Sequence, residues 1–228
     1  MRKVLFFLLA SSILSSCSVY KKYADTEAPW EEEISSLEDL DDIESYPEEA
    51  ILFIGSSSIR RWTSIKEDMA PYKPIRRGYG GAHFTDLIHF TDRLVYPHKF
   101  QALAIFVAND ITGGENDKSV KEVMRLFEEV VRTVRVKYPY VPIFQIAVTP
   151  TNSRWKVWPT VQELNASFKT YCETHENMYY IDPSEAYLDQ DGKPRSELFV
   201  EDQLHLNEEG YDIWASFIKK EFDKVLKP

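Results

Sequence analysis

Short apolar segments alternate with longer segments of helical periodicity from Ala50 to the C-terminus. Continuous apolar runs of four to eight residues are typical of strands buried on both faces of a sheet. Such runs occur at 51–54, 102–108, 141–148 and 178–181, with a further short strand predicted at 74–76. Helical spacing is found between them, at 85–96, 118–138, 159–175 and 207–225. This alternation predicts an α/β fold, a three-layer α/β/α sandwich around a five-stranded parallel sheet.

The first residues have the pattern of a secretory signal. Arg2 and Lys3 precede an apolar stretch at 4–14, which is too short to span a bilayer. The sequence then resembles a bacterial lipobox that ends at Cys17. The resemblance implies removal of residues 1–16, lipidation of Cys17 and a cell-envelope location on a membrane, either periplasmic or at the outer membrane. The alternative is an ordinary secretory signal with an incidental cysteine.

An acidic segment separates this signal from the first apolar run. Residues 23–59 contain twelve carboxylates and no Lys or Arg. We expect residues 17–30 to form a polar tether and 31–49 a linker and a short acidic helix that packs on the domain, since carboxylates at the start of the helix suit its dipole. Residues 50–228 would then form the globular domain. A charged arm that binds a partner is the alternative for the helix.

Composition excludes several classes of protein. The net charge is −10, and no basic stripe for nucleic acid stands out. Cys17 and Cys172 are the only cysteines, which excludes a disulfide framework and a cysteine-based zinc site. His83, His89 and His98 lack the spacing of a metal site, so neither a metal nor another cofactor is expected.

Polar and glycine-rich motifs follow the predicted strands. In an open parallel sheet, ligands bind beyond the carboxyl ends of the strands. The motifs lie at 55–58 (GSSS), 80–81 (GG) and 109–110 (ND), and a fourth, at 202–205 (DQLH), precedes the last helix. Taken alone, the first is an N-cap, and the second and third are ordinary turns. All four together predict one site at this edge of the sheet.

In this order the motifs resemble those of the SGNH, or GDSL-type, hydrolase family, and the resemblance extends from about Ala50 to the C-terminus. It is greatest with the branch that includes platelet-activating-factor acetylhydrolase-like esterases. The resemblance implies a flavodoxin-like sheet with Ser57 as nucleophile, His205 as general base and Asp202 as the carboxylate that orients it.

The same resemblance implies which groups stabilise the oxyanion. The backbone N–H of Gly81 and the side-chain amide of Asn109 would donate to it, and Asp110 would be structural. Three positions depart from the family pattern, one of which is Arg76, just ahead of the glycine turn where relatives often have asparagine. Ser56 replaces an aspartate, and Val107 replaces a glycine, so that added bulk is expected to narrow the acyl pocket.

Three further residues are predicted to contact substrate. Tyr79 and His83 flank the glycine turn, and Arg154 follows the fourth predicted strand. For Arg154, a surface guanidinium stacked on a neighbouring tryptophan is an equal alternative.

The resemblance implies a serine esterase that works through an acyl-enzyme. We expect it to act on short acyl groups, acetyl above all, on carbohydrate, because the sequence shows no long apolar lid segment. Its partner would be a small-molecule or glycan ester, besides the lipid anchor and its membrane, and no nucleic acid. A lysophospholipase-like lipid acylhydrolase and a non-catalytic glycan-binding lipoprotein are the alternatives. The sequence does not indicate the oligomeric state.

Overall fold

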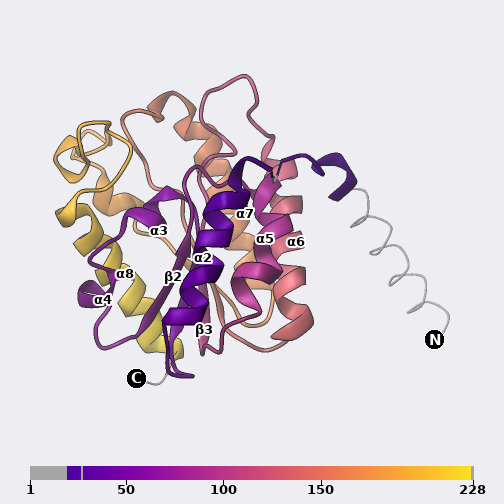
Figure 1. Ribbon diagram of the computed structural model, residues 1–228. Coiled ribbons are helices and arrows are strands. Elements are labelled where there is room, and N and C mark those ends of the chain that lie inside the picture. The colour runs from indigo at the N-terminus through magenta and orange to yellow at the C-terminus, as the bar shows by residue number, and fades with distance from the viewer. Residues whose placement is uncertain (1–19, 27, 227–228) are drawn as a thin grey trace.

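The computed structural model describes residues 20–26 and 28–226. A single parallel sheet with the strand order β2-β1-β3-β4-β5 occupies its centre (Figure 1). The strands are β1 (Ile51–Gly55), β2 (Pro74–Gly78), β3 (Ala102–Phe106), β4 (Ile143–Ile146) and β5 (Met178–Ile181). The predicted α/β class and the five-stranded parallel sheet are confirmed.

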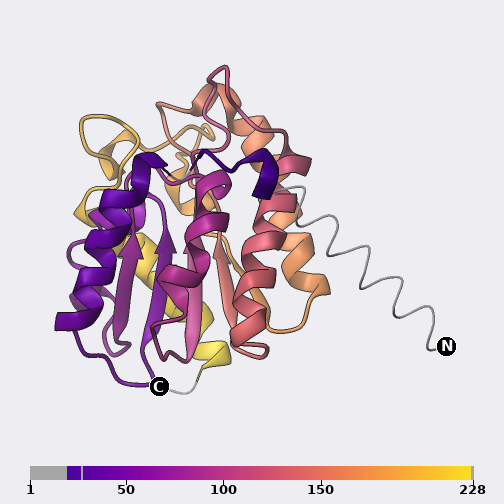
Figure 2. The same ribbon diagram turned by 45° about the vertical axis from the view of Figure 1, so that its right-hand side comes forward.

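Helices cover both faces of this sheet. Figure 2 shows α2, α5 and α6 in front of the strands and α8 behind them. The α-helices are α2 (Glu31–Ile43), α3 (Ser57–Arg61), α4 (Ile65–Asp68), α5 (Phe84–Val95), α6 (Val120–Lys137), α7 (Trp158–Thr174) and α8 (Glu208–Val225). Short 3-10 helices are η1 (Ala28–Trp30), η2 (Trp155–Val157), η3 (Ser184–Tyr187) and η4 (Ser196–Leu198).

The core is divided by the sheet into two apolar layers, because successive side chains of each strand point to opposite faces. Leu52 and Ile54 of β1 pack with residues of α5, α6 and α7. Ile51 and Phe53 pack on the other face with residues of α3, α4 and α8. All four side chains are fully buried, which explains why β1 is a continuous apolar run.

The chain reverses its direction of winding between β1 and β3, which are neighbours in the sheet although β2 lies between them in sequence. At such a point the crossover helices leave on opposite faces, and a crevice opens beyond the strand ends. The fold therefore places a site at the carboxyl ends of β1 and β3.

In the segment 17–30, expected to be a tether, the described residues 20–26 and 28–30 pack on the domain. The Tyr20 hydroxyl donates to the Ile88 carbonyl of α5 (3.1 Å), and the Thr26 hydroxyl to that of Thr85 (2.9 Å). Tyr23 is buried, and its hydroxyl donates to Glu122 of α6. The rings of Tyr20 and Tyr23 thus pack on the core cluster beside α5 and α6. The composition of the segment does not indicate this packing.

The predicted signal peptide (1–16) and the lipidation site Cys17 lie outside the described residues, and both stay predictions. Within the described residues, no helix is long and apolar enough to cross a membrane.

Candidate active site

The turn after β1 holds Ser57 at the first position of α3. Gly55 has φ 134°, and a Cβ there would lie 1.9 Å from the Phe106 carbonyl oxygen at the end of β3. The same carbonyl accepts the Ser56 N–H (2.8 Å). Only glycine fits where the ends of these two strands come so close. The turn that follows leaves Ser57 partly exposed above the edge of the sheet.

The loop before α8 holds Asp202 and His205. One Asp202 oxygen, Oδ1, accepts the backbone N–H groups of Leu204 and His205, both at 2.9 Å. Gln203 between them has φ 55°, a left-handed conformation that costs a non-glycine residue energy. Its backbone compensates with hydrogen bonds to Val200 and from Ser153. The tight turn leaves the second Asp202 oxygen free to face the imidazole.

Ser57, His205 and Asp202 form a hydrogen-bonded chain. The Ser57 Oγ lies 2.8 Å from His205 Nε2, and His205 Nδ1 lies 2.6 Å from Asp202 Oδ2. Partial burial alone would raise the pKa of the Asp202 carboxyl, but hydrogen bonds from the His205 backbone and side chain and from Leu204 lower that pKa to about 2. Asp202 is therefore an ionised acceptor, suited to hold a proton on Nδ1 and leave Nε2 as the acceptor for Ser57.

Helix α8 ties this loop to the serine turn. Asn207 caps the helix, with its side-chain oxygen accepting the Gly210 N–H (3.0 Å). From the next residue, the Tyr211 hydroxyl donates to the Ser58 carbonyl (2.9 Å). Helix α8, which follows the fourth motif, thus contacts the backbone of the first motif, 153 residues away in the chain.

The loop after β3 presents Asn109. Its amide donates to the Ala82 carbonyl (2.8 Å), and its side-chain oxygen accepts a guanidinium N–H from Arg154 (2.7 Å). Arg154 also donates to the Ala108 carbonyl (2.6 Å). An amide nitrogen carries two hydrogens, and within the described residues only one of those of Asn109 has an acceptor. Asn109 and Ser57 line the same cavity, so the second N–H is available there. Arg154 is thus not a free surface side chain. Besides any contact with substrate, its guanidinium fixes the orientation of the Asn109 amide.

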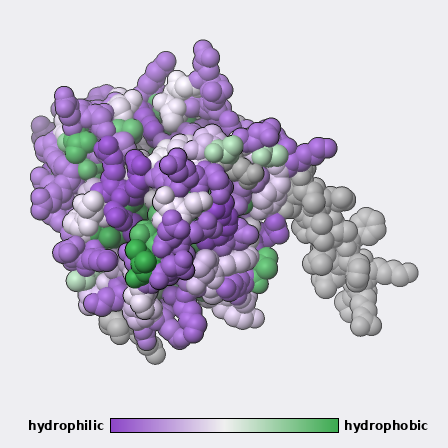
Figure 3. Space-filling view, in the orientation of Figure 1, coloured by the Kyte–Doolittle hydropathy of each residue, from purple (hydrophilic) through white to green (hydrophobic). Residues whose placement is uncertain are grey.

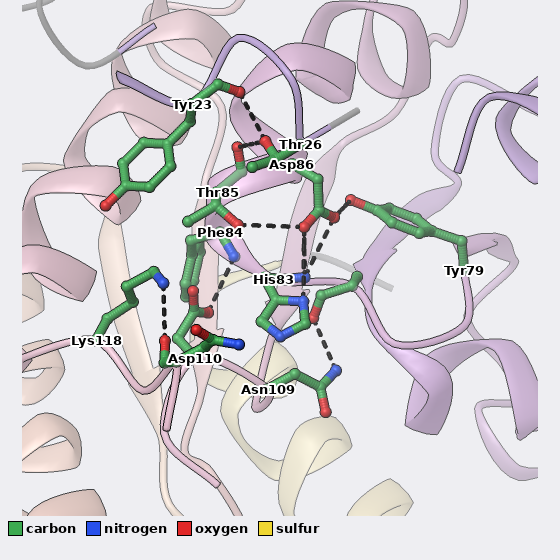
Figure 4. Close-up of polar contacts among 12 residues, drawn as sticks. Tyr23, Thr26, Tyr79, His83, Phe84, Thr85, Asp86, Asn109, Asp110 and Lys118 are labelled. Carbon is green, nitrogen blue, oxygen red and sulfur yellow. Dashed lines mark hydrogen bonds and ion pairs between the residues drawn. The ribbon is translucent and has the colours of Figure 1, made fainter. Parts of the chain in front are cut away.

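Two buried carboxylates lie beneath these loops (Figure 4). Asp110 accepts the Phe84 N–H at the start of α5 (2.9 Å), which joins the Asn109 loop to the glycine turn. Asp86 accepts the Tyr79 hydroxyl (2.7 Å) and the His83 N–H (3.1 Å). Burial raises the pKa of both Asp86 and Asp110 to about 7. The expected structural role of Asp110 agrees with this contact.

The Asp110→Asn variant is expected to make stability less dependent on pH. An unfolded aspartate has a pKa of about 3.9, so between about pH 4 and 7 the folded protein binds a proton at Asp110 that the unfolded chain does not. The free energy of unfolding therefore falls as the pH rises through this window. Asparagine keeps the acceptor for Phe84 and cannot ionise.

Thermal melting from about pH 5 to 8 tests this linkage. The melting temperature of Asp110→Asn relative to the parent protein should rise with pH. The exposed Asp191→Asn should follow the parent, and parallel curves for all three proteins would contradict the expected role of burial.

Two openings meet at Asn109 and Arg154. One is a small cavity of about 30 Å³ beside Ser57 and His205, with apolar walls from Ile111, Val148, Trp158 and Val161. The other is an open hollow of about 470 Å³ on the side of the glycine turn, lined by Trp30, Gly81, His83 and the loop 112–117. A group bound near Ser57 therefore meets a tight apolar space in one direction and a wide polar space in the other.

The structure brings together most of the predicted site residues: Ser57, His205, Asp202, Asn109, Arg154, Gly81 and His83. Tyr79 is an exception, because its side chain is 0 % exposed and packs against Trp30 and Phe90. It supports the glycine turn and offers no surface to a substrate. Val107 also differs from expectation, since its side chain is buried in the core. The walls of the small cavity come from other residues.

Comparison with known families decides what kind of site this is. A model of the GDSL-like Lipase/Acylhydrolase family matches residues 55–213. The chain belongs to this family. It is accordingly an ester-hydrolysing enzyme, and the matched range contains all four motifs. None of the curated proteins compared with the chain matches it.

Several solved structures share the fold of this GDSL-like hydrolase. A protein from Streptococcus pneumonia whose description refers to platelet activating factor has a TM-score of 0.73 at 20% identity, covering 90% of this chain and 98% of its own. A GDSL-like lipase from Bacteroides thetaiotaomicron has a TM-score of 0.70 at 16% identity, covering 85% and 98%. A carbohydrate esterase family 3 protein from Talaromyces cellulolyticus has a TM-score of 0.58 at 14% identity, covering 78% and 97%.

Proposed function

We propose that this GDSL-like hydrolase is a serine esterase that removes short acyl groups, acetyl above all, from carbohydrate. The observation that carries the proposal is the chain of hydrogen bonds from Ser57 through His205 to Asp202, at 2.8 and 2.6 Å. A serine hydroxyl becomes a useful nucleophile only when a base removes its proton, and this arrangement supplies the base and its orienting carboxylate.

The reaction takes two steps. Ser57 attacks the ester carbonyl while His205 takes the hydroxyl proton and then passes it to the departing alcohol. Water, activated by the same imidazole, attacks the acyl-enzyme and releases the acid. The oxyanion that forms in each step is stabilised by the backbone N–H groups of Ser57 and Gly81 and by the Asn109 amide, because donors that already point at the developing charge need no reorganisation.

The size of the small cavity supports a short acyl group. A volume of about 30 Å³ has room for roughly two water molecules. An acetyl group fits such a space, whereas a fatty acyl chain would have to displace Trp158 or Val161, both of which are buried. The cost of forcing extra methylenes into a packed wall is about 1–3 kcal/mol.

The wide hollow supports a carbohydrate on the alcohol side. It combines one aromatic side chain, Trp30, with the polar groups of His83, Arg154 and Asp117. Sugar rings carry apolar C–H faces together with a rim of hydroxyls, and this mixture suits them better than it suits a lipid chain. The fold neighbour from Talaromyces cellulolyticus, described as a carbohydrate esterase, is consistent with this substrate class.

A chain-length series tests the acyl part of the proposal. We expect kcat/KM to fall at least about tenfold from p-nitrophenyl acetate to the octanoate, which corresponds to roughly 1.4 kcal/mol. Val161→Ala widens the small cavity and should raise the butyrate-to-acetate ratio. A preference for octanoate, or faster hydrolysis of a lysophospholipid than of an acetylated xylo-oligosaccharide, would favour the lipid acylhydrolase instead.

A further inference from the structure

The glycine turn depends on a residue outside the matched family range. Gly80 is buried, and its backbone N–H donates to both carboxylate oxygens of Glu33, each at 3.0 Å. Glu33 lies in the first turn of α2, 47 residues earlier in the chain. A buried N–H without an acceptor is costly, so Glu33 satisfies a group that the turn itself leaves unpaired.

Two more side chains enclose the same turn. The Arg60 guanidinium donates to Glu33 (3.1 Å), and it lies 2.9 Å from the place that a Cβ on Gly80 would occupy. On the next residue, a Cβ on Gly81 would lie 2.8 Å from the Trp30 ring. Arg60 therefore offsets the negative charge beside the turn, and Trp30 restricts its movement on the other side.

Ion pairs join helix α2 to the rest of the domain. Ile34 is its one fully buried side chain among residues 31–43. Arg93 of α5 pairs with Glu31 and Glu38, at 2.8 and 2.6 Å. Arg77, itself only 1 % exposed, pairs with Asp41 and Glu44 (2.6 and 3.1 Å). The face that carries α2 is largely hydrophilic (Figure 3). The four carboxylates just named nevertheless bind this domain's own arginines.

We propose that Glu33 is a positioning residue for the oxyanion site, and that α2 thereby forms part of the active site. This inference rests on the proposed function, in which the Gly81 N–H stabilises the oxyanion. Two consecutive glycines have more backbone freedom than any other pair of residues. By holding the N–H of Gly80, Glu33 restrains the peptide group that follows it, and that peptide group carries the Gly81 N–H.

The inference predicts an effect on kcat. Glu33→Ala should lower kcat for p-nitrophenyl acetate by about 10- to 100-fold, because a donor displaced by about 1 Å loses much of its effect. KM should change less than about twofold, since the turn stabilises the transition state more than it binds the substrate in the ground state. Glu33→Gln keeps one acceptor oxygen for Gly80 and should recover part of kcat.

Glu32→Gln is the matched control, because it removes the same charge from the neighbouring, exposed position of the same helix turn. It should leave kcat unchanged. The reaction rate with a fluorophosphonate probe should fall in the order parent, Glu33→Gln, Glu33→Ala, with melting temperatures used to confirm folding. If Glu33→Ala does not fold, the comparison of Glu33→Gln with Glu32→Gln decides the same question.

The inference would be overturned if Glu33→Ala had the same kcat as the parent. If only Glu33→Gln folds, an equal kcat for that variant and the parent would overturn it. So would an equal loss in Glu32→Gln, because that would indicate a general effect of charge. Failure of the proposed function would look different, since the parent protein itself would neither hydrolyse the ester nor react with the probe.

Discussion

Ser57→Ala is expected to lower kcat for p-nitrophenyl acetate by about 10⁶-fold and to abolish labelling by a fluorophosphonate probe. The reason is chemical: without the Ser57 Oγ, the His205 Nε2 that now lies 2.8 Å from it has no hydroxyl to deprotonate. The side chain is small and partly exposed, so the melting temperature should stay within a few degrees of the parent. Ester hydrolysis and probe labelling of purified protein measure this effect.

The neighbouring serines provide the comparison. Ser56 is buried, and Ser58 bonds to the rest of the molecule through its backbone carbonyl. Ser56→Ala and Ser58→Ala should both retain the covalent label. A label that persists in Ser57→Ala and disappears in either neighbour would assign the nucleophile to that neighbour and reject the arrangement proposed here.

Asp202→Asn is expected to lower kcat by about 10³- to 10⁴-fold. Asp202 Oδ1 is held by the N–H groups of Leu204 and His205, so the asparagine oxygen should keep that place. The new amide nitrogen would then face His205 Nδ1 and donate to it. This favours the tautomer with its proton on Nε2, which cannot accept a proton from Ser57. Asp202 is 42 % exposed, and for this reason the loss should not exceed that range.

Glu201→Gln is the control for Asp202→Asn, because it removes an adjacent exposed carboxylate and should leave turnover unchanged. The pH dependence of kcat for both variants and the parent completes the measurement. An Asp202→Asn protein with parental kcat would mean that another group orients the imidazole.

The regular elements were predictable because they bury their side chains periodically. The apolar run at 51–54 became β1, and the helical pattern at 118–138 became α6, with ends that differ by one or two residues. The expected acidic helix of the N-terminal segment was also found, as α2. The partners of its carboxylates were not predictable, because Arg77 and Arg93 are distant in sequence. A charge pattern read along the chain does not show where the opposite charges will lie.

The proximity of Ser57, His205 and Asn109 was also predictable, since each follows or precedes an element that ends at the same edge of a parallel sheet. The roles of the supporting residues were not. Arg154 lies against Asn109, and Tyr79 turns into the core to meet Asp86, because of how α5 and the loop after β4 pack. Glu33 gave no local signal, as one carboxylate among twelve in an acidic segment.

The order of strands, helices and motifs determined by itself the fold class and the edge of the sheet where the candidate catalytic residues meet. Both follow from local periodicity and from parallel topology. Only the tertiary structure decided which groups complete the site. The acceptor for Gly80, the partner that orients Asn109 and the size of the acyl cavity all depend on contacts between residues far apart in the chain, whose geometry no local pattern contains.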